Sequence, residues 1–321
     1  MRFFMNKRWL KTGLKISIAI ILLGWFLYRS DLGKIFENLF NLPLLVFLAV
    51  VILNFFYIFI KSFKWRLLLP QCSIKKLLSL SLIGQFYSLF SAGQFVGEAT
   101  KIYILGKDQK ETGQTAMSVI VDKITGIIGL VVVSIFGLIF TDNVLPQKAI
   151  WTFSFIVLVC LVFLFLIRLI FIYNSLINFL DFCSIKAPKF KKICGWFIEI
   201  INAWHYFSKK FGVIFICVIL SIIFQLILVG SYMILGWGLD INLSFLDWCW
   251  VLGIFFGLLS LPITIGGLGV REGSLVGLLG LFAVEPERAL AFSFSILGMQ
   301  LIFAVIGGIL ELKRTRLFDF G

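Results

Sequence analysis

The chain has 321 residues, of which 60% are hydrophobic, 17% aromatic and only 14% charged. A soluble domain carries about 25% charged residues and could not bury this many large apolar side chains. The composition therefore excludes an ordinary soluble protein and indicates a single integral membrane domain over residues 1–321.

Lysine and arginine outnumber aspartate and glutamate by 29 to 16. In a membrane protein this surplus indicates basic cytoplasmic loops beside anionic lipid, so nucleic acid is not expected as a partner. The six cysteines contain no CxxC pair, and His205 is the only histidine. We therefore expect no metal site and no cofactor.

Apolar runs of about 20 residues, the length that crosses a bilayer, recur along the chain. The first is 10–28, and residues 1–15 at the start of the chain carry five basic residues and no acidic one. It is predicted to be a retained span, because no small-x-small cleavage site precedes Ser30. Five more full spans are expected at residues 43–60, 119–140, 150–172, 212–235 and 289–310.

The charges of the connecting segments orient these spans. Four segments, namely the N-terminus, residues 61–76, the polar stretch 173–211 and the C-terminus, hold 19 Lys and Arg against four acids. The remaining loops, including 29–41, hold four Lys and Arg against six acids. Because positive loops stay inside, both termini and the 173–211 loop are predicted to be cytoplasmic, in a multi-pass plasma or inner membrane protein.

Two apolar segments, 77–105 and 245–282, are each interrupted by a glycine-bearing breaker. Irregular backbone at membrane depth is tolerated only where protein or a water-filled cavity satisfies its polar groups. The excess of lysine and arginine on the cytoplasmic side is preserved only if each segment returns to the side of the membrane from which it entered. We therefore predict two oppositely oriented re-entrant helical hairpins, the first dipping from the cytoplasm and the second from outside.

This order of elements has the pattern of an inverted repeat, with candidate halves 43–140 and 212–310. The two breakers also resemble each other weakly, because Glu98 follows Gly93, and Glu272 follows Gly267, at the same spacing. Glycine is frequent in such chains, so chance explains the second similarity equally well. In transporters of this design the broken hairpins meet near the midplane and form the site.

Charged residues at membrane depth are costly and mark binding or ion pathways. The candidates are Glu98, Lys101, Asp122, Lys123, Arg271 and Glu272. In the functional interpretation the cations hold an anionic headgroup, while the two glutamates couple it to protons or bind a cationic moiety.

Pairing offers a second interpretation of these charges. Glu98 and Lys101 are three residues apart and could pair on one helical face. Arg271 and Glu272 are adjacent and would diverge, so each is expected to need a partner elsewhere. Ion pairs across the hairpins, Glu98 with Arg271 and Lys101 with Glu272, would then only hold the fold together.

Uncharged residues at the breakers complete the candidate site. Glycines 266, 267 and 269 could expose N–H groups to a phosphate beside a helix that starts near Arg271. They could equally permit close helix packing. Gln94 and Thr264 could bind substrate or satisfy local backbone groups.

Residues 262–276, PITIGGLGVREGSLV, resemble the signature of the flippase-like membrane domain shared by lysylphosphatidylglycerol synthases and their stand-alone relatives. Residues 93–101 and 121–126 resemble weaker motifs of the same family. The resemblance implies movement of a lipid across the bilayer, with Glu98, Arg271 and Glu272 as site residues. The aminoacyl-transferase of the synthases is not expected in this chain.

These inferences favour a lipid flippase that moves a phospholipid or a polyprenyl-phosphate-linked headgroup between leaflets. A separate headgroup-modifying enzyme is then an expected partner. One alternative is a membrane-embedded transferase that uses a lipid-phosphate donor, although carboxylates for a metal are scarce. Another is a non-transporting subunit of an envelope-assembly complex.

Overall fold

The computed structural model describes residues 24–26, 28–90, 94–109, 112–141, 170–186, 194–195, 197–198, 201–202, 205, 210–260, 264 and 266–318. Within them all regular structure is helical, which confirms the all-α class. Four helices are long and apolar enough to cross a membrane: Leu44–Leu68, Thr115–Phe140, Phe211–Trp237 and Pro286–Thr315. They coincide with four of the predicted spans; 10–28 and 150–172 lie almost wholly outside the described residues.

The segment predicted as the first outer loop is a helix, α2 (Leu32–Asn41). Asp31 caps it, because its Oδ1 accepts a hydrogen bond from the Gly33 N–H at 2.8 Å. Three exposed apolar residues recur every four positions, Leu32, Phe36 and Phe40. The charge count alone missed this periodicity, which suits a helix lying in the membrane interface.

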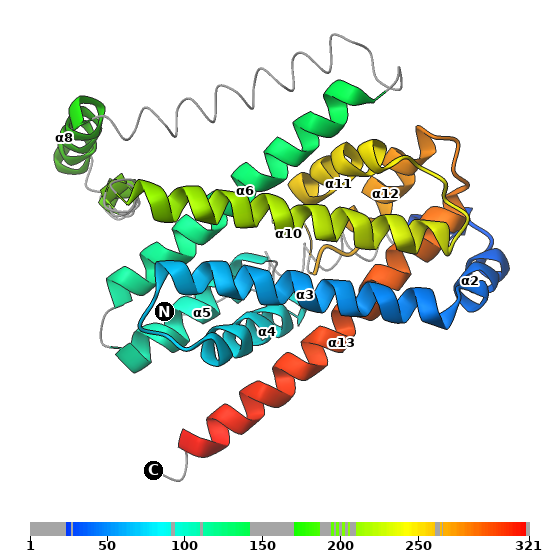
Figure 1. Ribbon diagram of the computed structural model, residues 1–321, viewed down its shortest axis with the longest axis horizontal. Helices are drawn as coiled ribbons and strands as arrows, with labels where there is room; N and C mark the ends of the chain where they lie inside the picture. Colours follow the sequence, from blue (N-terminus) through cyan, green and yellow to red (C-terminus); the bar gives the residue numbers. More distant parts are fainter. Residues whose placement is uncertain are drawn as a thin grey trace.

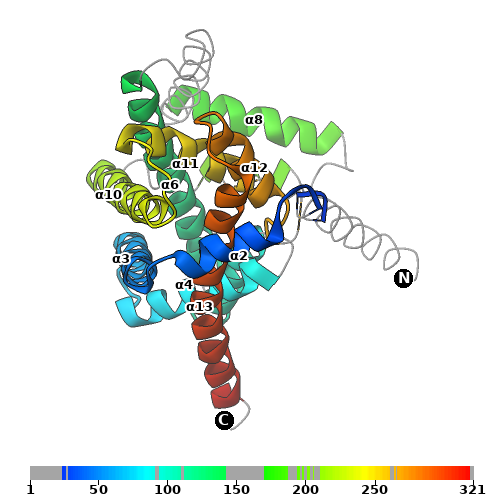
Figure 2. The ribbon, with the colours of Figure 1, turned by 90° about the vertical axis from the view of Figure 1, so that its right-hand side faces the viewer.

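Helices α3 (Leu44–Leu68) and α10 (Phe211–Trp237) lie side by side (Figures 1 and 2). They are antiparallel, because a Cβ at Gly238, just after α10, would lie 2.6 Å from Leu42, just before α3. Helix α3 also continues well past the predicted end of its span at residue 60. Lys61 and Lys64, predicted to lie in a cytoplasmic segment, are therefore on this helix, and Lys64 is fully buried.

Two helix pairs occupy the predicted hairpins, α4 (Ile74–Phe90) with α5 (Gln94–Gln109) and α11 (Phe245–Ser260) with α12 (Val270–Gly280). The first pair begins where α3 ends and the second where α10 ends, so they start from opposite ends of the bundle (Figure 1). Their inner ends meet, because a Cβ at Gly266 would lie 2.8 Å from the Leu89 carbonyl oxygen.

The two remaining long helices each pack on the hairpin of the other half. Helix α6 (Thr112–Phe140) packs on α11, and α13 (Pro286–Phe318) packs on α4. Both contacts are close approaches at glycine: a Cβ at Gly137 would lie 2.5 Å from the Leu246 carbonyl oxygen, and one at Gly307 would overlap the Leu82 carbonyl. Most of helix α8 (Ile170–Lys186) lies within residues 173–211, the segment predicted to be a loop.

Replacing Gly307 with alanine is expected to lower the free energy of unfolding by about 1–3 kcal/mol, because the added methyl group has no room against the α4 backbone. Gly230 on α10 is the matched control, since nothing lies within 4 Å of its Cβ position. Alanine there should leave stability unchanged or raise it slightly. Thermal unfolding of both purified variants in one detergent measures the difference; equal midpoints would contradict the prediction.

Candidate functional site

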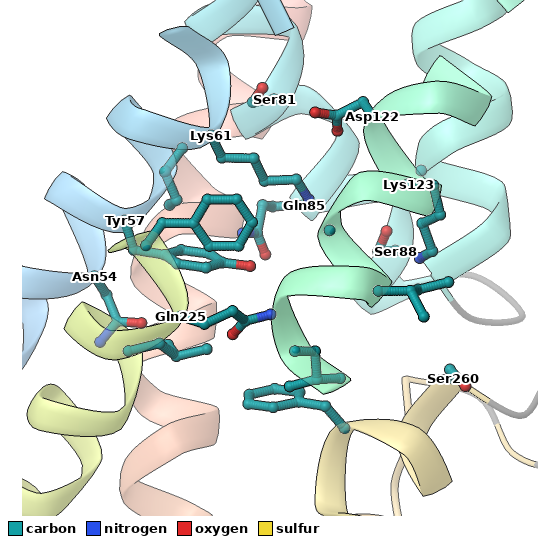
Figure 3. Close-up of a pocket in the computed structure, with 18 of the residues that line it drawn as sticks. Asn54, Tyr57, Lys61, Ser81, Gln85, Ser88, Asp122, Lys123, Gln225 and Ser260 are labelled. Carbon is teal, nitrogen blue, oxygen red and sulfur yellow. The ribbon is translucent and has the colours of Figure 1, made fainter. Parts of the chain in front are cut away.

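A cavity of about 650 Å³ lies between the two halves. Helices α3, α4, α5, α6, α10, α11 and α13 each present one face to it (Figure 3). On α3 the lining residues follow helical spacing: Asn54, Tyr57, Ile58, Lys61 and Lys64. The site is therefore built by stripes on packed helices rather than by a loop.

One side of the cavity is charged. Its ionisable residues are Lys61 and Lys64 from α3, Glu98 and Lys101 from α5, and Asp122 and Lys123 from α6. Four are cations and two are acids, so this part of the wall carries a surplus of two positive charges. We call these six residues the lysine cluster.

Within the lysine cluster, Glu98 is paired on its own helix, as its spacing predicted. Lys101 Nζ donates to Glu98 Oε2 at 3.0 Å and lies 5.5 Å from the centre of the Trp65 ring. Lys61 Nζ lies 3.9 Å from Glu98 Oε1, which is too long for a hydrogen bond. The Lys61 side chain is 28% exposed, so it is the looser member of this trio.

Lys64 has a different environment, although it lies one helical turn from Lys61. Its Nζ donates to the Asp122 carbonyl oxygen at 2.8 Å, Thr125 Oγ1 at 3.2 Å and Ser221 Oγ at 3.1 Å. It also forms an ion pair with Asp122 Oδ1 at 2.9 Å. An ammonium group has three protons to donate, so Lys64 is fully engaged in joining α3, α6 and α10.

The opposite side of the cavity is mainly apolar. It is formed by residues from α10, α11 and α13: Leu228, Ile254, Phe256, Leu258, Met299 and Phe303. Phe224 lies instead beside the lysine cluster, with its ring centre 5.1 Å from Lys64 Nζ. The cavity is thus amphiphilic, with a cationic side and a hydrocarbon side. In the described part of the chain, no group of three or more His, Cys, Asp or Glu residues could hold a metal ion.

Arg271 and Glu272 do not line the cavity. They do not need separate partners, because the Arg271 guanidinium turns back and contacts Glu272 Oε1 from Nη2 at 2.8 Å and from Nε at 3.0 Å. Ser293 on α13 donates to the same oxygen at 3.2 Å. The expected ion pairs across the hairpins are absent from the described residues; each hairpin pairs its own charges.

The predicted phosphate position at the start of α12 is occupied by this protein's own carboxylate. Gly266, Gly267 and Gly269 have φ angles of 62°, 76° and 82°, a region that favours glycine. Helix α12 starts at Val270, and Glu272 Oε2 accepts from the Gly269 N–H at 2.5 Å. The partial positive charge at the N-terminus of α12 is therefore balanced by Glu272, so this helix end does not need an external anion.

The two uncharged candidates are Thr264 and Gln94. Thr264 is buried, and its Oγ1 has no hydrogen-bond partner in the described structure. Gln94 begins α5, and its side chain lies outside the described structure.

The structure thus brings Glu98, Lys101, Asp122 and Lys123 together in one cavity and leaves the Arg271–Glu272 pair behind its wall. Gln300 connects the two regions, since it lines the cavity and its Oε1 accepts from Arg271 Nη1 at 3.3 Å. Sequence reasoning missed several residues of the cavity wall, among them Tyr57, Lys61, Lys64, Gln85 and Gln225. The helical spacing of Tyr57, Lys61 and Lys64 was the signal that could have found three of them.

Long apolar helices, two opposed helical hairpins and a charged interior cavity define a multi-pass helical membrane protein. Residues 13–308 match the profile of the family described as Lysylphosphatidylglycerol synthase TM region. The chain belongs to that family, as the resemblance of residues 262–276 predicted. Searches of curated proteins and of solved structures returned no match.

Proposed function

We propose that this protein moves an anionic lipid headgroup, on a phospholipid or a polyprenyl phosphate, between the leaflets of the plasma or inner membrane. The observation that carries the proposal is the amphiphilic cavity. Its lysine cluster has a surplus of two positive charges, and its other side is hydrocarbon. A phosphate with an attached acyl or prenyl chain has the complementary distribution of charge and apolar surface.

Lys61 is the residue best placed to receive the phosphate. Lys64 has no proton left to donate, and Lys101 already donates to Glu98. Lys61 is partly exposed and is not hydrogen-bonded to Glu98. A phosphate oxygen can therefore approach Lys61 without breaking a short ion pair, and Glu98 stays neutralised by Lys101.

The arrangement of the helix pairs suits movement from one leaflet to the other. Helices α4–α5 and α11–α12 start from opposite ends and meet at Gly266 and Leu89. The packing of α6 on α11 is matched by that of α13 on α4. This correspondence supports re-entrant hairpins in an inverted repeat of 43–140 and 212–310, in which the halves rock about a central site. The excess of lysine and arginine near both termini supports a cytoplasmic position for them.

The proposal is transport without chemistry, and a separate headgroup-modifying enzyme then supplies the lipid. Both carboxylates in the cavity, Glu98 and Asp122, already form ion pairs with lysines. This favours a binding role over that of a metal-dependent lipid-phosphate transferase, which needs carboxylates available for the ion.

Substituting Lys61 with glutamine is expected to reduce translocation of fluorescent phosphatidylglycerol in proteoliposomes by about tenfold. That factor corresponds to the loss of one charge-assisted hydrogen bond of about 1.5 kcal/mol. Accessibility of the label to a membrane-impermeant quencher measures the rate. Lys75→Gln is the matched control, because Lys75 is exposed at the start of α4 and does not line the cavity.

A wild-type rate for Lys61→Gln, or an equal decrease in both variants, would remove Lys61 from the transport path. Failure of the wild-type protein to move any anionic lipid faster than protein-free vesicles would overturn the proposed function itself.

A further inference from the structure

The described residues that line the cavity reach the surface of the protein at one place. Three of them are exposed, Ile127 on α6 and Gly257 and Leu258 on α11, whereas the others are buried or half-buried. The side chain of Ile127 is 50% exposed and that of Leu258 is 37% exposed. We call these three residues the lateral opening.

Helices α6 and α11 touch at one end of their contact and separate at the lateral opening. They are antiparallel: a Cβ at Gly137 would lie 2.5 Å from the Leu246 carbonyl oxygen, and a Cβ at Gly253 would overlap the Ser134 hydroxyl. Gly257 follows Gly253 by one helical turn on the same face, yet nothing in the described structure lies within 4 Å of its Cβ position. The two helices therefore part within one turn and leave a gap.

The gap faces the hydrocarbon of the bilayer. Ile127 lies midway along Thr115–Phe140, the part of α6 that is long and apolar enough to cross a membrane. Polar groups at the middle of a bilayer are unfavourable, so a headgroup does not belong in this gap. An acyl or prenyl chain has no polar group to desolvate and is the occupant that matches this depth.

Both sides of the cavity lead to the lateral opening. Lys123, a member of the lysine cluster, lies one helical turn before Ile127 on α6. Ile254, on the apolar side of the cavity, lies one helical turn before Leu258 on α11. A lipid with its phosphate at the lysine cluster and the start of its chain against the apolar side would therefore place the rest of that chain in the gap.

We propose that the hydrocarbon chain of the transported lipid leaves the cavity through the lateral opening and stays in the bilayer core while the headgroup crosses. Ile127 and Leu258 contact the chain from α6 and α11, and Gly257 keeps the gap free because it has no side chain. The proposal rests on the proposed function and assigns a site to the other end of the same lipid.

A side chain placed in the gap tests this role. Gly257→Phe is expected to slow translocation of fluorescent phosphatidylglycerol in proteoliposomes by about tenfold or more, because the ring and the lipid chain would compete for one space. Gly277→Phe is the matched control, since Gly277 is exposed on α12, has nothing within 4 Å of its Cβ position and does not line the cavity. The control should transport at the wild-type rate, and both variants should unfold at the wild-type temperature.

A phosphatidylglycerol with a photoactivatable diazirine in one acyl chain locates the chain directly. After illumination, peptide mass spectrometry should find the label at Ile127 and Leu258, and Lys61→Gln should reduce that labelling because it weakens binding of the phosphate. Ile223 on α10 reports ordinary contact with the bilayer, since it is 41% exposed and does not line the cavity. Its labelling should not depend on Lys61.

The outcomes separate this inference from the function beneath it. A wild-type rate for Gly257→Phe, where Lys61→Gln is impaired, would overturn the role of the lateral opening and leave the proposed function standing. Labelling of Ile127 and Leu258 that is as independent of Lys61 as that of Ile223 would overturn it too, because only bulk lipid would then occupy the gap. A wild-type protein that moves no anionic lipid would instead overturn the proposed function.

Discussion

Arg271→Ala is expected to lower the free energy of unfolding by about 3–5 kcal/mol, the usual effect of removing one partner of a buried ion pair. Glu272 is fully buried and, among the described residues, would be left with only the Gly269 N–H and the Ser293 hydroxyl as partners. Its carboxylate also holds the first turn of α12, so the breaker should loosen with it. Thermal unfolding in detergent and the yield of monodisperse protein measure the effect.

Arg288→Ala is the matched control for this prediction. Arg288 pairs with Glu285 at 3.5 Å on the surface, with 36% of its side chain exposed. Removal of a pair of this kind changes stability by about 1 kcal/mol or less. A stable Arg271→Ala protein that no longer binds lipid would contradict the structural role and return Arg271 to the substrate site.

Lys64→Met is expected to be comparably destabilising, by about 3–5 kcal/mol, because it leaves Asp122 buried and unpaired between α3, α6 and α10. The double variant Lys64→Met with Asp122→Asn should recover part of that loss, since it also removes the orphaned charge. Unfolding midpoints of the two single variants and the double variant give the coupling free energy.

Lys61→Gln is the control for the stability prediction made for Lys64→Met. Lys61 lies on the same face of the same helix, yet Lys61→Gln should change stability little, because its one ion pair with a described residue is 3.9 Å long and partly exposed. Additive effects of the Lys64 and Asp122 substitutions, or equal destabilisation by the Lys61 and Lys64 variants, would contradict the assignment.

Four of the spans and the second breaker could be predicted from sequence because they depend on local properties. Length and hydropathy define a membrane-crossing helix, and four of the predicted spans are found. Glycines mark the second breaker, where three of them have positive φ. The class of protein was predicted from the composition, and the family was predicted from residues 262–276, which include the second breaker.

The partners of the charged residues could not be predicted, because they depend on contacts between distant segments. Lys64 was counted as a loop cation, since nothing local shows that Asp122 and Ser221 surround it. The Arg271–Glu272 pair was missed for a different reason. Side chains at adjacent helical positions diverge, but the long Arg271 side chain at the helix start bends back to its neighbour.

The exchanged packing of the long helices also bears on how the protein assembles. Helix α6 places Gly137 against α11, and α13 places Gly307 against α4, so each half completes the interior of the other. In a fragment that ended after α6, the face of α6 that carries Gly137 would have no α11 backbone to pack against. We therefore expect the two halves to depend on each other for folding, so that the native bundle closes only after α13 has been synthesised.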